Sequence, residues 1–553
     1  MSELLLKHFD LLAQAPDGVK RLRELILTLA VQGKLVPQDP NDEPASVLLE
    51  RIRAEKERLI AEGTIKRDKP LPPIADEEKP FELPQGWEWA RNAEIFSLRK
   101  GRNPKVLSEM PVGKAYLDIE ALDRHQIRRY SEDVAAPTCT ANDILVVCDG
   151  SRSGLVLQGK DGIVGSTLSV VETPGFMQPY VRLLFRAGYR RYNSGMKGAA
   201  IPHLDTKVLL SEVTGLPPLH EQTRIVARVE ELMRLCDALE AKAQLDATQH
   251  AQLLQTLLGT LTDSASPEEL AENWQRVAAH FDLLLDRPEA VDALEQTILQ
   301  LAVRGLLVPQ DASDEPASML LERIRAEKDL FVAAGKIKRD KPLPPISAEE
   351  KPFELREGWE WVRVGDIVEM LNGYAFKSEW FKQTGVRLLR NLNISHGFVD
   401  WSQPVMLHPE IAKEYEPFAL KAGDIVLSLD RPIISTGLKY AVVCESDLPC
   451  LLLQRVARLT PIPAAVSSEF LVLWLQSDLF MSTIDPGRSN GVPHISTKQV
   501  ERLAFAVPPL AEQSRIVSRV GQLRQLCSGL RNKLVVNRST QMQLADALVA
   551  EVA

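Results

Sequence analysis

Apolar residues recur with alternating spacings of four and three in two stretches of the chain. This spacing is the heptad pattern of a helix that buries one seam against a partner helix. The seam positions are Ile225, Val229, Leu232, Cys236, Leu239 and Ala243 in the first stretch, and Ile516, Val520, Leu523, Cys527, Leu530 and Leu534 in the second. The pattern predicts two long helices that pair antiparallel with each other.

Both heptad stretches begin in the same way, with the tandem prolines Pro217-Pro218 and Pro508-Pro509. A proline is excluded from a helix interior but is tolerated in the first turn, so each pair marks the start of a helix. The residues that follow read Leu-x-Glu-Gln-x-Arg-Ile-Val both times, at a constant offset of 291 positions. The same helix-forming element is therefore present twice.

A second repeat lies upstream of each of these elements. Residues 29–89 align without a gap with residues 301–361, and 46 of the 61 positions are identical. This repeat predicts the end of one helix, an amphipathic helix that starts at 42–46, and a proline-rich extended strap at 65–74. The basic residues 66–69 of the strap suit a phosphate contact, but a solvated charged surface is the favoured interpretation. Self-similarity over this length indicates internal duplication.

Between the repeats, two stretches differ almost completely from each other. Short β-rich runs such as 143–147 and 424–428 alternate with glycine-rich turns, and a helix is predicted at 469–475. Segment 159–167 lacks the lysine that would reach a phosphate in a phosphate-binding loop, so we interpret it as a hairpin. Each stretch is predicted to be a compact α/β domain.

Together these patterns predict an α+β protein in which two α/β domains are separated by two long antiparallel coiled-coil helices. The duplicated halves are expected to close into a pseudo-two-fold, circular arrangement, because the chain ends in the helix that corresponds to the one leading into its second half. The predicted modules are an N-terminal helical connector (1–85), a first α/β domain (86–216), a first heptad helix (217–262), a central connector (263–357), a second α/β domain (358–507) and a second heptad helix (508–553).

Composition and charge narrow the class of protein. The 553 residues exceed one ordinary core, and no apolar run reaches the roughly 20 residues of a membrane span. The N-terminus lacks the features of a signal peptide, so we expect a cytoplasmic protein. The formal net charge is −9, but it is +4 over residues 90–215 and −1 over residues 362–506. The acidic residues therefore concentrate in the helical connectors. Each of the two domains can still present a basic surface to phosphate groups.

The motifs of several catalytic classes are missing from the sequence. It contains no Asn/Asp-Pro-Pro-aromatic loop of an amine methyltransferase, no His-Glu-x-x-His and no Gly-x-Ser-x-Gly. The six cysteines show no Cys-x-x-Cys pairing, and Cys236 and Cys527 fall on the helix seams as small apolar residues. We therefore expect no catalytic site, no metal site and no cofactor on this chain.

Loops that carry basic or amide side chains beside glycine are candidates for reading DNA bases. Arginine can donate two hydrogen bonds to guanine and asparagine can pair with adenine, although a single exposed arginine is most often ordinary surface. The candidates in the first domain are Ser151, Arg152, Lys160, Arg190, Arg191, Asn193, Lys197, His203 and Lys207. Those in the second domain are Arg387, Arg390, Asn391, Asn393, Arg431, Arg488, Asn490, His494 and Lys498.

One short motif matches between the two otherwise divergent domains. It reads Ile-Pro-His-Leu-Asp-Thr-Lys at 201–207 and Val-Pro-His-Ile-Ser-Thr-Lys at 492–498, and Lys197 and Arg488 precede it at corresponding positions. Two interpretations stay open. The motif either seats the short helix that leads into the heptad helix, or it presents its basic residues to DNA.

The doubled Pro-Pro-Leu-x-Glu-Gln-x-Arg-Ile-Val element with its heptad helix resembles the specificity (S) subunits of type I restriction-modification enzymes. The segment Gln-Thr-Ile-Leu-Gln-Leu-Ala-Val-Arg-Gly at 296–305 and the Leu-Leu-Glu-Arg-Ile-Arg-Ala-Glu-Lys that follows it resemble the same family. The resemblance covers the chain in order. One departure is that a connector module here precedes both recognition domains.

The resemblance implies a non-catalytic subunit in which each α/β domain reads one half of a bipartite, asymmetric site in double-stranded DNA. The helices would set the spacer and hold two modification (M) subunits, which carry S-adenosylmethionine and methylate adenine. Restriction (R) subunits would join through M and use ATP and Mg. The residues expected on the helix platform are Ile225, Val229, Leu232, Cys236, Leu239, Ile516, Val520, Leu523, Cys527 and Leu530. The alternatives are a coiled-coil scaffold without sequence readout, or a chain with its own methyltransferase or nuclease activity.

Overall fold

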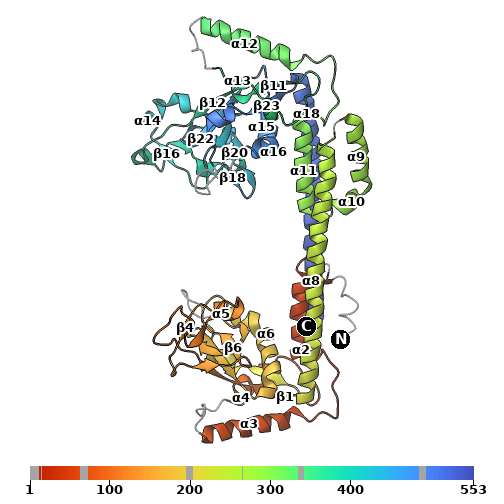
Figure 1. Cartoon of the computed structure of the whole chain (residues 1–553), viewed down its shortest axis with the longest axis vertical. Helices are drawn as coiled ribbons and strands as arrows, with labels where there is room; N and C mark the ends of the chain where they lie inside the picture. The colour runs from red at the N-terminus through yellow and green to blue at the C-terminus, as the bar shows by residue number, and fades with distance from the viewer. Residues whose placement is uncertain are drawn as a thin grey trace. The chain divides into compact units, whose positions relative to one another are not determined.

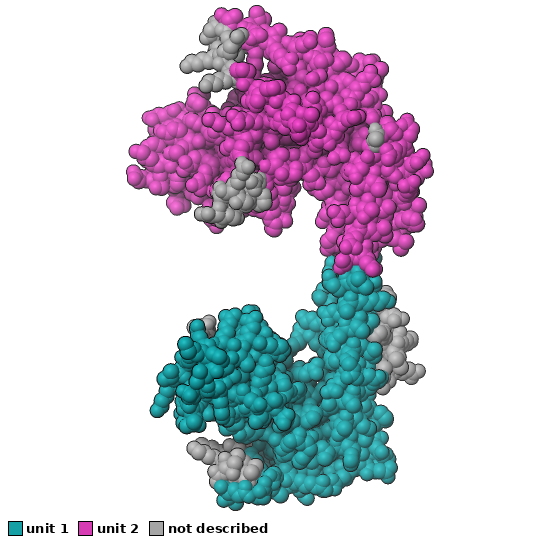
Figure 2. All heavy atoms as spheres, in the orientation of Figure 1, with its two compact units in different colours: residues 1–246, 537–553 teal, residues 247–536 magenta. Residues whose placement is uncertain are grey.

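The computed structural model describes residues 12–13, 15–62, 72–194, 203–264, 266–333, 342–484 and 494–552. The chain forms two compact units, one of residues 1–246 with 537–553 and one of residues 247–536 (Figure 2). Each unit holds one copy of the duplicated connector and one of the two divergent domains. The predicted α+β fold with internal duplication is confirmed.

In unit 1 the divergent domain is built from two four-stranded sheets, in the orders β2-β9-β6-β7 and β4-β3-β8-β5. The helices of unit 1 are α2 (Gly18–Val31), α3 (Ala45–Ala61), α4 (Asn92–Ile95), α5 (Ile119–Asp123), α6 (Gln178–Ser194), α7 (Thr206–Ser211) and the first part of α8 (Leu219–Thr262). The strands are β1 (Glu88–Arg91), β2 (Ser97–Lys100), β3 (Lys114–Leu117), β4 (Tyr130–Ser131), β5 (Thr138–Cys139), β6 (Ile144–Val147), β7 (Val156–Gln158), β8 (Gly162–Val164), β9 (Leu168–Glu172) and β10 (Val213–Leu216).

The hairpin predicted at 159–167 is wrong. Strand β7 pairs with β6 in the first sheet, whereas β8 pairs with β3 and β5 in the second. The chain crosses between the sheets at Gly159, whose backbone N–H donates to the Asp143 carbonyl at 2.8 Å. A Cβ at Gly159 would lie 2.3 Å from the Thr140 carbonyl oxygen, so this glycine permits the close approach.

In unit 2 the divergent domain has a five-stranded sheet in the order β12-β22-β17-β20-β15, a four-stranded sheet in the order β13-β16-β14-β21, and the pair β18-β19. Its helices are α9 (Pro267–Ala279), α10 (Phe281–Leu284), α11 (Pro288–Val303), α12 (Ala317–Ala333), α13 (Val364–Ile367), α14 (Pro409–Lys413), α15 (Ser468–Gln476), α16 (Asp478–Met481), α17 (Thr497–Glu501) and most of α18 (Leu510–Val552). Its strands are β11 (Glu360–Arg363), β12 (Val368–Asn372), β13 (Phe381–Lys382), β14 (Val386–Leu389), β15 (His396–Gly397), β16 (Met406–Leu407), β17 (Ile425–Ser428), β18 (Ile433–Ile434), β19 (Gly437–Leu438), β20 (Tyr440–Val442), β21 (Cys450–Leu452), β22 (Val456–Pro461) and β23 (Ala504–Val507).

Each divergent domain is closed at its base by a two-stranded antiparallel clip. In unit 1, β1 pairs with β10 in the register Glu88↔Leu216 to Arg91↔Val213. In unit 2, β11 pairs with β23 from Glu360↔Val507 to Arg363↔Ala504. Because the chain enters and leaves the domain through the same clip, everything between the two strands forms one self-contained insertion.

The identical Glu of the repeated Pro-Pro element fastens each clip to the start of its long helix. The carboxylate of Glu221 is buried and accepts hydrogen bonds from Trp87 Nε1 at 3.1 Å and Gln38 Nε2 at 3.2 Å. Glu512 accepts from Trp359 Nε1, also at 3.1 Å. Burial raises the pKa of both carboxyl groups above the ordinary value, because it disfavours their charged form.

Two further contacts of this element recur in both units. The side-chain amide of Gln222 donates to the Pro217 carbonyl at 2.9 Å, and Gln513 donates to the Pro508 carbonyl at 3.0 Å. The arginine two residues later pairs with a buried aspartate of the connector: Arg224 with Asp42 at 2.7 Å in unit 1, and Arg515 with Asp314 at 2.6 Å in unit 2. These contacts explain the matching Glu-Gln-x-Arg sequence by local anchoring of the helix start.

Most seam residues of the long helices are buried against a connector helix within each unit, whereas Ala243, at the end of the first predicted seam, is exposed. Ile225, Val229, Leu232 and Cys236 of α8 share a core with α2, and Ile516, Val520 and Cys527 of α18 share a core with α11 (Figure 1). Leu239, Leu523 and Leu530 are partly buried in the same cores.

Each long helix begins in one unit and contributes its end to the core of the other unit. Ala545 of α18 lies in the core of unit 1, and Leu254, Leu258 and Leu261 of α8 lie in the core of unit 2. This is the antiparallel order that the sequence predicts. The connector helices add ion pairs, such as Arg23 of α2 with Asp237 at 2.7 Å and Arg531 of α18 with Asp292 of α11 at 2.5 Å.

Candidate nucleic-acid interface

The central strand of each divergent domain ends at a polar cluster. All four residues of β6 and of β17 are buried, and each strand is followed two residues later by an aspartate, Asp149 or Asp430. A buried strand of this kind fixes the position of its own end, because its side chains are packed on both faces. The polar residues at these ends are therefore held in place by the sheet.

Each of the two histidines of the matching motif contacts one of these aspartates. His203 Nδ1 is 2.7 Å from Asp149 Oδ1, and His494 Nδ1 is 2.9 Å from Asp430 Oδ1. The backbones of the same pairs form isolated antiparallel bridges. The second carboxylate oxygen faces a cation in both cases: Lys100 Nζ at 4.0 Å from Asp149, and Arg455 at 3.0 Å from Asp430.

The turn after β6 brings two more candidates of the first domain to the same cluster. The side-chain amide of Asn193, at the end of α6, donates to the Ser151 carbonyl at 2.9 Å and to the Ser153 carbonyl at 3.1 Å. Asn193 thus holds the turn against the end of α6, and Ser151 is exposed two residues after Asp149.

Other basic candidates of the first domain are held by partners away from this cluster. Arg152 forms a two-point contact with Asp123, at 2.5 and 3.2 Å, and Lys160 Nζ lies 3.2 Å from His125 Nδ1. Arg190 pairs with Glu24 of α2 at 2.6 Å, and Arg191 pairs with Glu212 at 2.6 Å. Lys197 lies outside the described residues.

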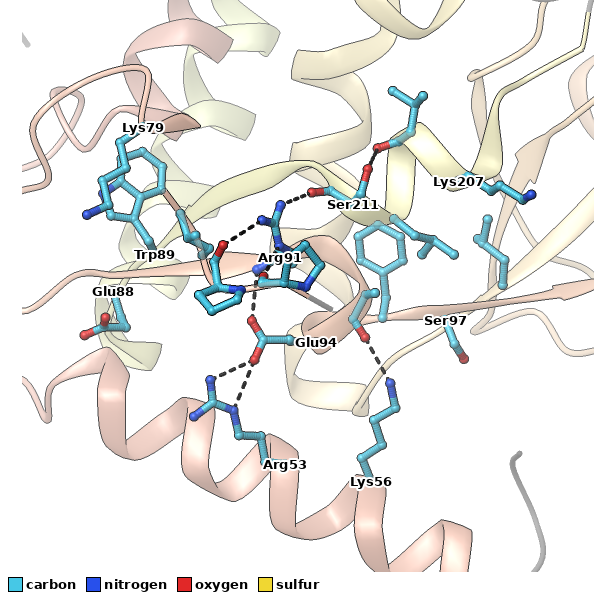
Figure 3. A pocket seen from close by; sticks show the side chains of 18 of the residues that line it. Arg53, Lys56, Lys79, Glu88, Trp89, Arg91, Glu94, Ser97, Lys207 and Ser211 are labelled. Atoms are coloured by element: carbon cyan, nitrogen blue, oxygen red, sulfur yellow. Dashed lines mark hydrogen bonds and ion pairs between the residues drawn. The ribbon is translucent and has the colours of Figure 1, made fainter. Parts of the chain in front are cut away.

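Lys207, on α7, lies at a groove of about 1240 Å³ between α3 and the base of the first domain (Figure 3). Other cations of this groove are already engaged. Arg53 pairs with Glu94 at 2.7 Å and Lys56 donates to the Ala93 carbonyl at 3.0 Å (Figure 3). The buried Arg91 pairs with Glu78 at 2.9 Å. The groove therefore seats α3 against the domain, with its charges largely compensated.

In the second domain, Asn391 and Arg431 join the Asp430 cluster. The side-chain amide of Asn391 donates to the Asp430 carbonyl at 2.5 Å, and its oxygen accepts from Lys439 Nζ. Arg431 is exposed and has a left-handed backbone, with φ of 48°. Such a conformation is costly for a residue with a side chain and is often found at functional sites.

The remaining candidates of the second domain are dispersed. Arg387 donates to the Ser446 and Leu448 carbonyls at 2.8 Å, and Arg390 donates to the Gln403 carbonyl at 2.5 Å. The buried Asn393 donates to the Asp400 carbonyl at 2.9 Å, so these three side chains shape the loops of the domain. Lys498 is exposed on α17. Arg488 and Asn490 lie outside the described residues.

The sequence reasoning did not single out the residues that complete the two clusters. Asp149 and Asp430 contact the histidines, Lys100 and Arg455 face these aspartates, and Lys439 donates to Asn391. A signal was available for the two aspartates, because Asp143 and Asp424 open the strand segments and a second aspartate follows six positions later in both. The cations lie on other strands, and no local pattern marks them.

Within the described ranges, no group of three or more His, Cys, Asp or Glu side chains is arranged to hold a metal ion. Across the same part of the chain, no helix has the length and apolar character needed to cross a membrane.

The sequence matches the family described as Type I restriction modification DNA specificity domain over residues 84–248 and 356–535. It is 49% identical to the Type I restriction enzyme EcoAI specificity subunit of Escherichia coli, across 96% of this chain and 93% of that protein. It is 36% identical to the EcoEI specificity subunit of the same organism, with the same coverage of both chains. The crystal structure of the HsdS subunit from Thermoanaerobacter tengcongensis aligns over 86% of this chain and 98% of that chain, with 18% identity and a TM-score of 0.39.

Proposed function

Because the chain belongs to the family of type I restriction-modification specificity subunits, we propose that each of its two divergent domains reads one half of a bipartite, asymmetric DNA target. The long helices set the spacer between the halves and hold two M subunits, which methylate adenine with S-adenosylmethionine. R subunits join through M and supply cleavage that depends on ATP and Mg. This chain contributes recognition and assembly, and no catalytic group.

The observation that carries this proposal is the contrast between the two domains and their identical seats. Both domains enter and leave through an equivalent clip, and both clips rest on a Trp–Glu hydrogen bond of 3.1 Å to the start of a long helix. The strands and loops above the clips share almost no sequence. A constant seat with a variable insert suits a module whose surface is free to read different bases.

Support for two equivalent partner subunits comes from the long helices. Large apolar side chains are exposed at three pairs of positions that are each 291 residues apart, which is the offset of the helix repeat. The pairs are Leu235 with Leu526, Leu245 with Val536, and Leu253 with Leu544. The seam residues are buried inside the chain, so these exposed positions are the surface that we propose for M.

A domain exchange tests the recognition proposal. Residues 92–212, between the strands of the first clip, are replaced by the corresponding segment of another family member, and methylated adenines are mapped by genome sequencing. We expect one half of the recognised motif to change while the other half and M-subunit assembly stay the same, because the seat is untouched. Exchange of residues 364–503 is the matched experiment and should change the opposite half. A single exchange that alters both halves would contradict the proposal.

Assembly is tested by substitution of one exposed pair. Leu235→Lys combined with Leu526→Lys should abolish co-purification of M subunits, whereas Val134→Lys, at an exposed apolar residue of the first domain, should leave it intact. Full assembly of the double variant would place the M contact elsewhere.

A further inference from the structure

The two divergent domains share one side-chain arrangement above their clips. In each, a carboxylate at the end of the central strand accepts a hydrogen bond from a histidine on one oxygen and faces a cation on the other. The members are Asp149, His203 and Lys100 in unit 1, and Asp430, His494 and Arg455 in unit 2. Lys100 and Arg455 come from strand ends or turns at unrelated sequence positions. The arrangement therefore persists although the residues that complete it differ.

In both domains the residue after the carboxylate has a positive φ, which is 105° at Gly150 and 48° at Arg431. A Cβ at Gly150 would meet no atom within 4 Å, so this turn opens to solvent. In both domains the aspartate–histidine pair therefore stands beside an open backbone turn.

The histidine side chain is not needed to seat the helix that follows it. That role belongs to the backbone, since the Leu204 N–H donates to the Cys148 carbonyl at 2.8 Å and the Ile495 N–H donates to the Leu429 carbonyl at 3.0 Å. The helix starts are capped by Asp205 and Ser496. The histidine rings are 54% and 45% exposed, and within the described residues only Nδ1 has a hydrogen-bond partner. Within the same part of the chain, Nε2 of each ring is therefore available to a ligand.

We propose that His203 and His494 are phosphate anchors, one in each half of the DNA site, and that Asp149 and Asp430 position them. This inference rests on the proposed function and adds the group that the histidines bind. The two domains diverge in the loops that read bases, so a side-chain arrangement common to both has to meet what every half-site shares, which is the sugar–phosphate backbone. The shared histidine–aspartate arrangement supplies affinity and register on the DNA, and the divergent loops supply specificity.

The chemistry of the cluster fits an anionic ligand. Contact with a phosphate requires the imidazolium form of the ring, in which Nδ1–H donates to the aspartate and Nε2–H donates to a phosphate oxygen. In that form one carboxylate would lie between two cations, the histidine and Lys100 or Arg455, and the cluster would have a net positive charge. Contact with a phosphate releases a counterion, which makes the contribution measurable from its salt dependence.

The test measures DNA binding by the complex of the full chain with its M subunits, over a series of salt concentrations. His203→Gln and His494→Gln are compared with wild type on a duplex that carries the recognised site and on one that does not. Each variant should weaken binding to both duplexes by the same factor and should reduce the salt slope by about 0.9. The double variant should lose about twice as much slope, because the two histidines belong to separate compact units and share no contacts. The methylated motif should stay unchanged.

Three controls make the result specific. His203→Lys keeps a cation and should preserve the slope. Asp149→Asn should give an intermediate loss, because the ring loses its orienting carboxylate. His220→Ala removes an exposed histidine whose counterpart in the other repeat is Ala511, and it should leave the slope unchanged. Hydrogen exchange of β6 and β17 verifies that the variants remain folded.

An unchanged salt slope in both glutamine variants would overturn the proposal, and so would a loss confined to one base pair of the site. The proposed function fails in a different way. If the wild-type complex binds both duplexes equally, sequence readout is absent, while the slope on either duplex still decides whether the histidines contact phosphate.

Discussion

Arg91→Ala provides the most direct test of how each divergent domain is seated. The Arg91 side chain is 4% exposed, and its guanidinium donates to the carbonyls of Pro72 at 3.0 Å, Pro73 at 3.3 Å and Ser211 at 2.7 Å. It also donates to both oxygens of Glu78 at 3.0 and 2.9 Å. It therefore joins the strap, the clip strand β1 and the end of α7 (Figure 3). Removing it leaves three carbonyls and one carboxylate without these donors.

The expected cost follows from the burial of this network. A hydrogen bond that involves a charged group contributes about 1.5–3 kcal/mol net, and less where its partner can bind water instead. Glu78 is 41% exposed and regains water, so we count only the carbonyl contacts of Arg91 and expect a total loss of about 3 kcal/mol. At about 1.4 kcal/mol for each factor of ten, local opening of the clip should become about 100-fold more frequent.

The assay is hydrogen exchange of the intact chain, read by mass spectrometry on peptides that contain β1 and β10. Exchange there should accelerate by about 100-fold, because the amides of the β1–β10 ladder exchange through local opening. The equivalent β11 and β23 act as an internal control, since Arg363 holds the same contacts to Pro344, Pro345 and Glu350 in unit 2. Arg363→Ala should reverse the pattern. Unchanged exchange at β1 and β10, or equal acceleration in both units, would refute the reasoning.

Three other predictions concern the buried glutamates, the spacer and the base contacts. Because burial raises the pKa of Glu221 and Glu512, the folded protein loses stability as the pH rises through that pKa. Glu221→Gln and Glu512→Gln should therefore each flatten the pH dependence of the free energy of unfolding in their own unit, measured by urea titration between pH 4 and 8. A steeper pH dependence would contradict this reasoning. Four residues inserted after Ala241 lengthen the helix by about 6 Å, which is close to two base-pair steps. Methylation mapping should then show a longer spacer with both half-sites retained. An active variant that keeps the old spacer would disprove that the helix sets the spacer length. Arg152→Ala and Arg431→Ala should each reduce discrimination at particular base pairs by about 1–3 kcal/mol in competition binding, whereas an even loss over all sequences would reassign the residue to a phosphate.

The parts of this protein that the sequence by itself determined are those governed by short-range or periodic patterns. Tandem prolines at 217–218 and 508–509 fixed where the long helices begin, because proline is excluded from a helix interior. The heptads identified the residues that α8 and α18 bury, since helix geometry places every third or fourth residue on one face. Direct comparison of the chain with itself revealed the duplication and the two divergent domains between its copies.

Tertiary structure alone decided which distant residues meet. The heptads were interpreted as one pair of helices, yet a connector helix packs against each seam. The spacing of apolar residues along a helix does not reveal how many neighbouring helices cover them. Segment 159–167 had the composition of a hairpin, but pairing with β3 and β5 places β8 in a second sheet. Arg152 lies in a loop that suits DNA, and only the fold shows Asp123 against it. His203 and Asp149 are 54 positions apart, and the physical reason that the sequence does not pair them is that side chains in aperiodic loops are brought together by the sheet beneath them.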